Sequence, residues 1–593
     1  MEFPRPDLDE FFRTYAIMGF ALERDESRLV VSANISGRYN LWGVDLDCPY
    51  PYQLTYADQM PSQILTDPRG RFILAGVDQD GDEKTQIYAI PRSGGRLQPV
   101  RVSPGKTYFL AKISEDGRRI YYSTDRDNPQ FLNICRYDLE TDREEVLHVG
   151  EGASAALVAV SPDERSYVYV MHFSNTFQVP YLVSDGVVRC LTPDPTAAQN
   201  VHDVAFLDNA TVVLTTNFGQ DRAYLARFDL AAEQFSRWTS AAEELTGITL
   251  HRDSGTVYVA GSWGVQDRLY RVRMGSDELG VVPLPAAVIQ QMECGTSGTL
   301  YLLGRSDVEP FNIWKLNGER WQPVTNNRVM GAGRDVLVPS ETLRFPSFDG
   351  MEIESLWFKA QPAVAHGYTI VWPHGGPQAA ERRMFRPFFQ YALSRGYNIW
   401  APNFRGSTGY GAEFEKLVEG DWGEGPRLDM MASVDWLTAS GRASRDRLFV
   451  VGGSYGGYMT LLLHGRHAER FQAYVDIFGP SSLLSLYETV PEHWKPSMAR
   501  WVGNPATDRE RMVRESPITY LEQMTRPMLV IQGANDPRVV KAESDQIVEA
   551  LRANGVEVEY LVLEDEGHGF QKKENEIRVY QRVIEFLDAH RNP

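Results

Sequence analysis

The sequence predicts a chain of two domains, an N-terminal seven-bladed β-propeller followed by a domain with a mostly parallel, doubly wound α/β sheet. Three observations predict this architecture: the length, a repeat and a change of pattern. The 593 residues exceed what one hydrophobic core usually organises, about 250–300 residues. Short β-rich runs repeat through the first half, whereas apolar strands alternate with amphipathic helices after about residue 335. We therefore expect an N-terminal segment at 1–15 that packs on the second domain, a propeller over 16–330 and the second domain over 331–593.

The propeller prediction depends on a turn that recurs at regular spacing. The turn is rich in Asp, Gly or Pro and precedes a short β-rich run, as residues 67–70 precede the run 72–75. It recurs every 42 to 49 residues, a period typical of propeller blades. The turns are marked by Asp25, Asp67, Asp116, Asp163, Asp208, Asp253 and Ser297. Seven markers predict seven blades.

The composition is that of an ordinary globular protein, with 43% hydrophobic and 23% charged residues. A formal net charge of −19 argues against nucleic acid or an anionic membrane as a partner. The first 15 residues lack the basic and apolar regions of a signal peptide, and no run approaches the ~18 apolar residues of a membrane span. The four cysteines, Cys48, Cys135, Cys190 and Cys294, form no metal-binding motif. We therefore expect a cytoplasmic protein with free thiols and with neither metal nor cofactor.

In the second half, an antiparallel lead-in over 336–338 and 356–358 precedes alternating strands and helices. The expected strands are 369–372, 398–401, 448–451, 473–477, 528–531 and 559–563, with helices over 429–437, 543–553 and 574–590. In sheets of this kind, active residues lie at the carboxyl ends of the strands.

The strongest motif follows one of these strand ends. Residues 452–457 read Gly-Gly-Ser-Tyr-Gly-Gly, directly after the apolar run 448–451 and directly before a helical pattern. This is the G-x-S-x-G nucleophile elbow in its strand–turn–helix context, which identifies the second domain as an α/β-hydrolase. Ser454 is the expected nucleophile.

A serine hydroxyl needs a base, and in this fold the acid and the histidine follow the serine on later loops. Asp536 follows the strand at 528–531, and His568 follows the strand at 559–563. We expect His568 to take the Ser454 proton and Asp536 to orient the imidazole. The N–H of Tyr455 and that of Gly376, in the turn 373–377, are the expected oxyanion-hole donors.

These motifs together resemble the prolyl oligopeptidase family of serine peptidases. The resemblance spans the whole chain and is strong from about residue 340. The segments that carry it are 374–377 (HGGP), 403–411 (NFRGSTGYG), 453–457 (GSYGG), 535–538 (NDPR) and 566–570 (EGHGF). The HGGP turn resembles the acylaminoacyl-peptidase branch. The resemblance implies a peptidase whose site faces a cavity between the domains, with the propeller limiting access to short peptides.

Three departures from the family pattern bear on specificity. The first blade begins within about 20 residues, whereas prolyl oligopeptidase starts with a long hydrolase segment. His374 stands near the place of a family tyrosine, so no phenol is expected in the oxyanion hole. No paired-glutamate segment of the dipeptidyl-peptidase kind is recognised. Together, these departures weaken two interpretations, that of a prolyl oligopeptidase and that of a proline-directed dipeptidyl peptidase.

Two further assignments come from the resemblance alone. Arg538 matches an arginine that in relatives can hydrogen-bond a substrate carbonyl, and an inter-domain salt bridge is the alternative, ranked just behind it. The segment 494–502 resembles the lining of the primary specificity pocket, in which Trp494, Met498 and Trp501 would form a large apolar pocket. Core packing is the alternative for these three.

The function expected is release of an acylated or free terminal residue from short peptides through an acyl-enzyme on Ser454. An esterase or amidase on the same fold and a carboxypeptidase-type exopeptidase remain alternatives, as does a binding module with an inert hydrolase domain. Short peptides are the expected partners, and a homo-oligomer is compatible with the sequence.

Overall fold

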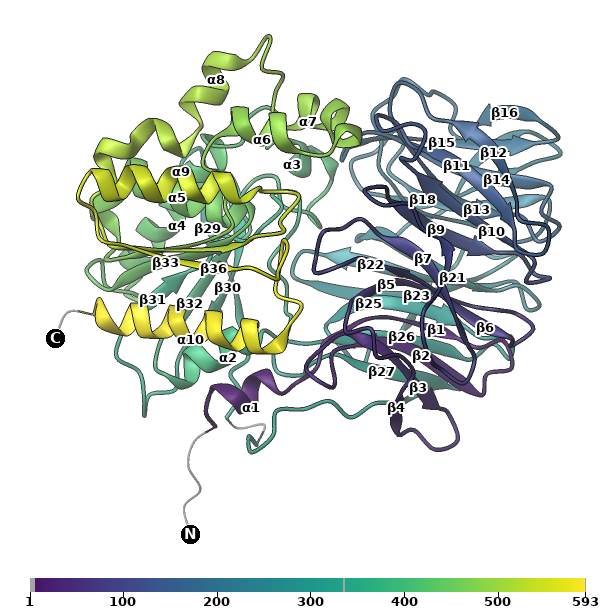
Figure 1. The fold of residues 1–593 in the computed structure, drawn as a ribbon, viewed down its shortest axis with the longest axis horizontal. Coiled ribbons are helices and arrows are strands. Elements are labelled where there is room, and N and C mark those ends of the chain that lie inside the picture. Colours follow the sequence, from purple (N-terminus) through teal and green to yellow (C-terminus); the bar gives the residue numbers. More distant parts are fainter. Residues whose placement is uncertain (1–5, 334–335, 592–593) are drawn as a thin grey trace.

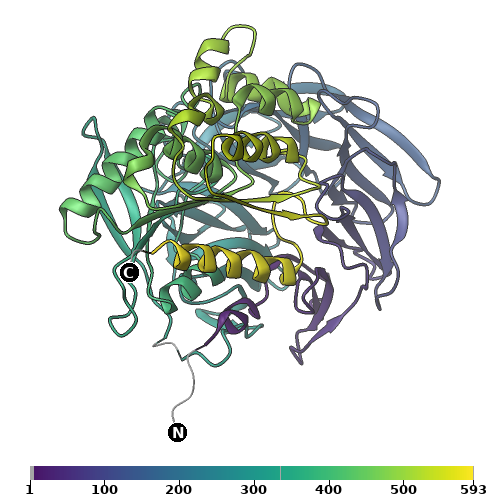
Figure 2. The same cartoon turned by 60° about the vertical axis from the view of Figure 1, so that its left-hand side comes forward.

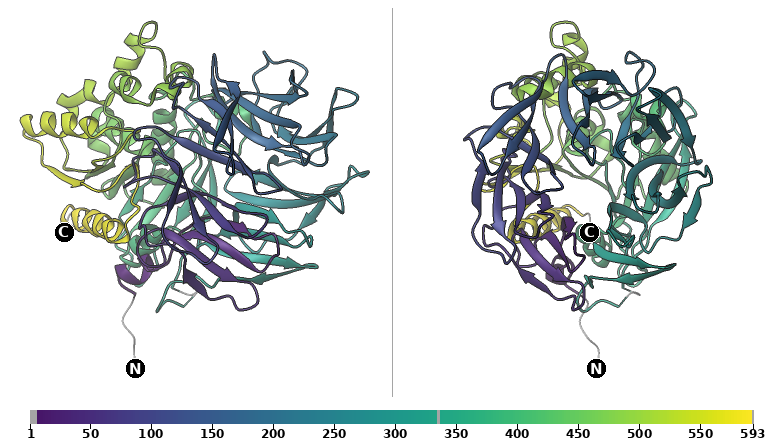
Figure 3. Two further views of the ribbon diagram at one scale, coloured as in Figure 1. Left: turned by 45° about the vertical axis from the view of Figure 1, so that its right-hand side comes forward. Right: turned by 90° about the vertical axis from the view of Figure 1, so that its right-hand side faces the viewer.

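The computed structural model describes residues 6–333 and 336–591, so the first five residues of the predicted N-terminal segment lie outside it. Two bodies lie side by side, a ring of β-sheets and a layered α/β domain (Figure 1). The ring is formed by the first half of the chain and is seen along its axis in the right-hand view of Figure 3. This confirms the predicted fold class.

The ring consists of seven four-stranded antiparallel sheets, each built from one continuous stretch of chain. The first three blades comprise β1 (Ile17–Leu22), β2 (Arg28–Ala33), β3 (Asn40–Asp45), β4 (Pro51–Gln53); β5 (Pro61–Thr66), β6 (Phe72–Val77), β7 (Gln86–Pro91), β8 (Gln98–Arg101); β9 (Tyr108–Ile113), β10 (Arg119–Thr124), β11 (Asn133–Asp138) and β12 (Arg143–Val149).

The remaining four blades comprise β13 (Ser154–Val160), β14 (Ser166–Ser174), β15 (Phe177–Ser184), β16 (Val187–Cys190); β17 (Val201–Phe206), β18 (Thr211–Thr216), β19 (Tyr224–Asp229), β20 (Gln234–Thr239); β21 (Glu244–His251), β22 (Thr256–Trp263), β23 (Gln266–Arg273), β24 (Gly280–Val282); β25 (Val288–Cys294), β26 (Leu300–Arg305), β27 (Asn312–Asn317) and β28 (Arg320–Pro323). Each turn marker read from the sequence lies between the first and second strands of a blade.

The ring closes by contacts between its first and last blades, and in the part of the chain that the structure describes each of these blades keeps its own four strands. The Gln291 side chain on β25 accepts from Phe20 N at 2.9 Å and donates to Phe20 O at 2.7 Å. Glu293 accepts from Leu22 N at 3.2 Å. These bonds satisfy backbone groups of β1 that have no strand partner on that side.

The second domain contains one eight-stranded sheet in the order β29-β30-β32-β31-β33-β34-β35-β36. β30 runs antiparallel to both of its neighbours, β29 and β32, and all pairings from β32 to β36 are parallel. Their bounds are β29 (Glu341–Pro346), β30 (Glu352–Phe358), β31 (Thr369–Val371), β32 (Asn398–Pro402), β33 (Leu448–Gly453), β34 (Tyr474–Ile477), β35 (Met528–Gly533) and β36 (Val558–Leu563).

Helices cover both faces of this sheet. One face carries α4, α5 and α9, and the other carries α2 and α10, joined by α1 (Figure 1). The helices are α1 (Leu8–Phe12), α2 (Pro387–Ser394), α3 (Ala412–Lys416), α4 (Gly425–Ala439), α5 (Tyr455–His467), α6 (Leu483–Thr489), α7 (Lys495–Trp501), α8 (Arg509–Arg514), α9 (Lys541–Ala553) and α10 (Lys573–Ala589), with 3₁₀ turns at Ala468–Arg470, Glu492–Trp494 and Pro517–Gln523. The buried β33 supplies apolar side chains to both faces, because its neighbours are parallel strands.

Within residues 6–333 and 336–591, no helix has the length and hydropathy needed to cross a bilayer.

Candidate active site

Ser454 occupies a strained turn between β33 and α5. Its backbone lies at φ 58° and ψ −123°, a left-handed conformation that non-glycine residues rarely adopt. The neighbouring glycines leave room for the turn: a Cβ on Gly456 would lie 2.2 Å from the carbonyl oxygen of Pro373. The turn therefore projects Ser454 at the N-terminus of α5, where helix N–H groups favour negative charge.

The structure brings the three residues of the predicted triad together. His568 Nε2 lies 2.8 Å from Ser454 Oγ, and His568 Nδ1 lies 2.6 Å from Asp536 Oδ2. The other Asp536 oxygen accepts from the backbone N–H groups of Arg538 and Val539, each at 2.9 Å. Asp536 is therefore held as a hydrogen-bonded acceptor that selects the Nδ1–H form of His568.

Two residues that line the same cavity as Ser454, Tyr455 and Gly376, have backbone N–H groups with no hydrogen-bond acceptor among the described residues. Tyr455 is the first residue of α5, so its N–H has no acceptor within the helix. Among the described residues, none accepts a hydrogen bond from Gly376 N–H, and Gly376 lines the same cavity as Ser454. Gly376 has φ 126°, which requires glycine, and its Cβ would lie 2.9 Å from Gln378 N.

His374 supports this turn from behind. It is buried and stacks on Phe404 at 4.2 Å between ring centroids, while its ring nitrogens lie 2.8 Å from Gly375 O and Ser407 Oγ. Burial lowers the pKa of His374 to about 4, so the imidazole is neutral at physiological pH. The HGGP turn is thereby tied to the 403–411 loop.

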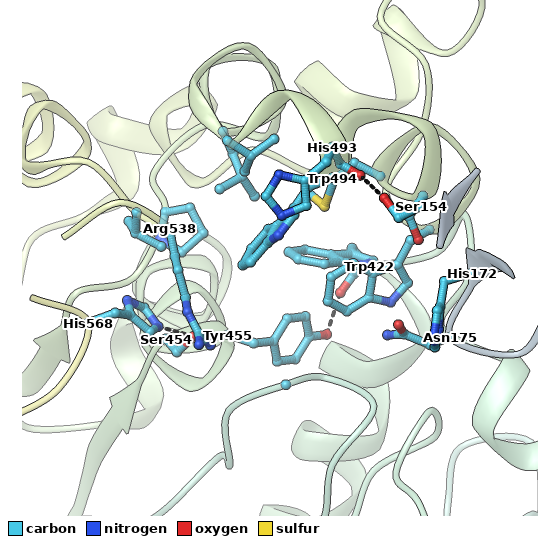
Figure 4. A pocket seen from close by; sticks show the side chains of 18 residues that line it. Ser154, His172, Asn175, Trp422, Ser454, Tyr455, His493, Trp494, Arg538 and His568 are labelled. Atoms are coloured by element: carbon cyan, nitrogen blue, oxygen red, sulfur yellow. Dashed lines mark hydrogen bonds between the residues drawn. The ribbon is translucent and has the colours of Figure 1, made fainter. Parts of the chain in front are cut away.

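A cavity of about 350 Å³ opens from Ser454 and reaches the propeller. Figure 4 shows Ser454 and His568 at one end, Trp422 and Trp494 in the middle, and blade residues at the other end. The blade residues are Ser154, His172 and Asn175. Both domains therefore contribute to one substrate-sized space.

Trp494, Met498 and Trp501 all line this cavity, as does Arg538. Trp422, Leu486 and Val490 complete the apolar wall, and sequence reasoning missed them. The Trp422 ring lies 5.0 Å from that of Trp501 at an interplanar angle of 81°, and Tyr455 Oη donates to Trp422 O at 2.5 Å. In the sequence, Trp422 stands between an aspartate and a glycine in a loop, and no motif marks it as part of a substrate cavity.

Arg538 takes part in the domain boundary as well as in the cavity. Its Nε lies 2.7 Å from Glu83 Oε1 in the second blade, and its guanidinium lies 5.7 Å from the Trp494 ring centroid. Arg538 thus forms the inter-domain salt bridge that was one of its two expected roles. Binding to a substrate carbonyl is compatible with the position of Arg538 in the cavity wall.

The turn between β6 and β7 touches both loops that carry the acid and the histidine. Lys572 Nζ bonds to Asp80 at 2.9 Å and to Asp565 at 2.6 Å. A Cβ on Gly81 would lie 2.7 Å from Gly567 N, immediately before His568. The propeller is therefore in direct contact with the catalytic loops.

Two adjacent glutamates do occur in the propeller, at Glu243 and Glu244. Both are buried, and neither lines the Ser454 cavity. Glu243 bonds to Tyr270 and Arg268, and Glu244 lies 3.3 Å from His202 Nε2. Each carboxylate thus has its own partner within the propeller.

A serine held in a strained elbow, hydrogen-bonded to a histidine and through it to an aspartate on an α/β-hydrolase sheet, defines a serine hydrolase. Residues 383–593 match the model of the prolyl oligopeptidase family. The protein is thus a serine peptidase whose hydrolase domain is similar, from residue 383 on, to the prolyl oligopeptidase family.

Relatives and solved structures agree with this assignment. Dipeptidyl aminopeptidase BIII of Pseudoxanthomonas mexicana is 28% identical over 534 residues, 84% of this chain and 75% of that protein. Acylamino-acid-releasing enzyme 1 of Oryza sativa subsp. japonica is 28% identical over 232 residues, 37% of this chain and 30% of that protein. The crystal structure of puromycin hydrolase matches this structure with a TM-score of 0.86. The match covers 99% of this chain and 96% of that chain, at 18% sequence identity. Because the match covers nearly the whole chain, the fold shared with that structure includes the propeller as well as the hydrolase domain.

Proposed function

We propose that the protein is an exopeptidase that releases an N-terminal residue, preferably an acylated one, from short peptides. The observation that carries this proposal is the 2.8 Å contact between Ser454 Oγ and His568 Nε2 at the end of a cavity walled by both domains. Both curated relatives described above are named for release of residues from peptides, which supports a peptide substrate.

In the proposed reaction, Ser454 Oγ attacks the carbonyl carbon of the scissile bond while His568 Nε2 takes its proton. The oxyanion accepts hydrogen bonds from the N–H groups of Tyr455 and Gly376. The C–N bond then breaks, and His568 returns the proton to the leaving amine. Water, deprotonated by His568, cleaves the acyl–Ser454 ester and restores the hydroxyl. Asp536 stabilises the imidazolium throughout.

The charge of the cavity favours a blocked amino terminus over a free one. Among the described residues that line it, none is Asp or Glu, whereas Arg538 contributes a positive charge. Burial lowers the pKa values of His172 and His493 in the wall, so both are neutral at pH 7. An ammonium group would find no counterion there, and an acyl amide needs none.

The apolar wall around Trp494, Met498 and Trp501 supports a large apolar side chain next to the cleaved bond. The propeller supports selection by size, because a reacting carbonyl has to come within ~3–3.5 Å of Ser454 Oγ inside a covered cavity. We also propose a cytoplasmic location, since the four cysteines are unpaired thiols.

One peptide panel tests the proposal. The same sequence with a large apolar first residue is offered acetylated, with a free amine and with an amidated carboxyl end, and kcat/KM is measured for each. We expect the acetylated peptide to be cleaved best and amidation to matter little. A clear preference for the free amine, with release of dipeptides, would favour dipeptidyl release. Dependence on a free carboxylate would favour the carboxypeptidase alternative.

Two controls separate peptidase activity from the rival readings. Fluorophosphonate labelling of the wild type but not of Ser454→Ala shows whether Ser454 is active, and an unlabelled wild type would mean an inert domain. A p-nitrophenyl ester turned over far better than any peptide amide would favour the esterase reading. Efficient cleavage of unstructured chains of roughly 50 residues or more would exclude a size filter.

A further inference from the structure

A second cavity, of about 180 Å³, lies at the domain boundary and shares no lining residue with the Ser454 cavity. The propeller contributes Arg305, at the end of β26, and Phe311. The hydrolase domain contributes Arg386, before α2, together with Lys573 and Glu576 at the start of α10. In Figure 2, α10 runs toward the first propeller blade, where Lys573 N donates to Gly37 O at 3.1 Å.

Two of the three cations in this cavity are already satisfied. Arg386 forms a two-pronged ion pair with Glu381, with N–O distances of 2.8 and 2.9 Å. Lys573 Nζ donates to the carbonyls of Phe12 and Thr14, each at 2.7 Å, and lies 3.8 Å from Glu576. Neither cation therefore needs a further partner.

Arg305 is different, because it has no carboxylate partner within the parts of the chain that the structure describes. Its guanidinium lies over the Phe311 ring at 4.1 Å and donates a hydrogen bond to the Met384 sulfur at 3.0 Å. Its Nε is fully buried and makes no hydrogen bond. Burial, together with the positive charge of Arg386, lowers the pKa of Arg305 to about 9. Since guanidinium groups keep their proton in proteins, this lowering measures an uncompensated charge.

The charges of the cavity do not balance. Three cations line it, and the carboxylates of Glu381 and Glu576 offset at most two of them. Burial also raises the pKa of Glu576, which weakens its contribution as an anion. An unpaired positive charge in such a space destabilises the folded state. A single small anion would remove that cost.

We propose that this cavity binds one monovalent inorganic anion of halide size, held by the Arg305 guanidinium and bridging the two domains. The guanidinium N–H groups of Arg305 that are not bonded to Met384 are the donors, with Arg386 as the second positive charge. The volume admits an ion and a few waters but no peptide. This site is independent of the peptidase chemistry proposed above.

The test compares chloride with gluconate at constant ionic strength while thermal unfolding is followed. We expect the wild-type unfolding midpoint to rise by at least about 2 °C and to saturate with chloride, because an anion that binds only the folded state stabilises it by mass action. The rise should vanish in Arg305→Gln. It should persist in Arg227→Gln, which removes an exposed arginine of β19 bonded to Ser236. An unchanged wild-type midpoint, or the same rise in Arg305→Gln, would refute the site.

A second measurement needs no variant and covers the case in which Arg305→Gln fails to fold. Crystals of the wild type soaked in bromide should give an anomalous peak within hydrogen-bonding reach of the Arg305 guanidinium. Crystals that diffract well without such a peak would contradict the proposal.

Discussion

Arg538 and Glu83 form an ion pair across the domain boundary, with Nε 2.7 Å from Oε1. Arg538 is two residues after Asp536, and its backbone N–H donates to that carboxylate. A residue of the second propeller blade is therefore linked through one side chain to the loop that orients His568.

We expect Glu83→Gln to lower kcat/KM by about three- to tenfold without a measurable loss of stability. The ion pair is partly exposed, so it contributes little to the free energy of unfolding. Its loss frees the acid loop, and small displacements of catalytic groups are costly in rate. Kinetics and thermal unfolding of the variant check this. Glu115→Gln, which breaks an exposed pair with Arg24 in the propeller, is the matched control, and an equal loss in both variants would contradict a positioning role.

Gly376→Ala should lower kcat by about 10²–10³ while KM changes less. The φ of 126° strains any other residue, and the added Cβ would meet Gln378 N at 2.9 Å, so the N–H turns away from the oxyanion. Steady-state kinetics on one peptide give both constants. Fluorophosphonate labelling of Ser454 should survive in part, because the nucleophile itself is intact. A variant with unchanged kcat would remove Gly376 from the oxyanion hole.

Met498→Trp should restrict the enzyme to substrates with small side chains at the cleaved bond. Met498 is buried in the apolar wall of the Ser454 cavity, so a larger ring reduces the space for the substrate side chain. We expect KM for a peptide with phenylalanine at the cleaved bond to rise at least about tenfold, whereas KM for the alanine peptide stays within about threefold. Equal effects on both peptides would assign Met498 to core packing.

Glu415→Gln should change how stability depends on pH. Burial, with Glu244 nearby, raises the pKa of Glu415 to about 7, whereas an unfolded glutamate titrates near ~4.3. Between these values the folded state holds the extra proton, so the free energy of unfolding of the wild type falls as pH rises. The variant keeps an acceptor for Asn200 Nδ2, which bonds to Glu415 at 3.0 Å, but cannot ionise.

We therefore expect the free energy of unfolding of the variant, relative to that of the wild type, to increase by about 1–3 kcal/mol as the pH is raised from 5 to 8. Urea unfolding at several pH values measures this difference. Glu413→Gln, an exposed position on the same helix, should show no such trend. A difference between Glu415→Gln and wild type that is constant with pH would contradict the assignment.

The fold could be predicted from sequence because its signals are local. All seven turn markers lie between the first two strands of a blade, where Asp and Gly provide the turn chemistry. The elbow at Ser454 and the loops of Asp536 and His568 follow strand ends, which the apolar runs identify. The expected lead-in strand at 336–338 was wrong: this stretch is irregular, and its apolar side chains pack beside α2, where Val338 N donates to Gln390.

The rest depends on how the two domains dock, and no local pattern encodes that. Ser154, His172 and Asn175 line the Ser454 cavity only because the fourth blade faces it. The turn of Asp80 and Glu83 likewise touches the catalytic loops from about 450 residues away. Arg305 looks in the sequence like an ordinary strand-end arginine, and only the three-dimensional structure shows that no carboxylate of residues 6–333 and 336–591 pairs with it.

The contact between α1 and α10 has a consequence for the order in which the chain is completed during synthesis. Lys573 Nζ donates to Phe12 O, 561 positions earlier, and Leu8, Phe11 and Phe12 are buried in the core beside α10. At about 5–20 residues per second, the ribosome needs roughly half a minute to two minutes to supply that partner. α1 therefore finds its place late, and its apolar side chains stay without their final cover until α10 has left the exit tunnel.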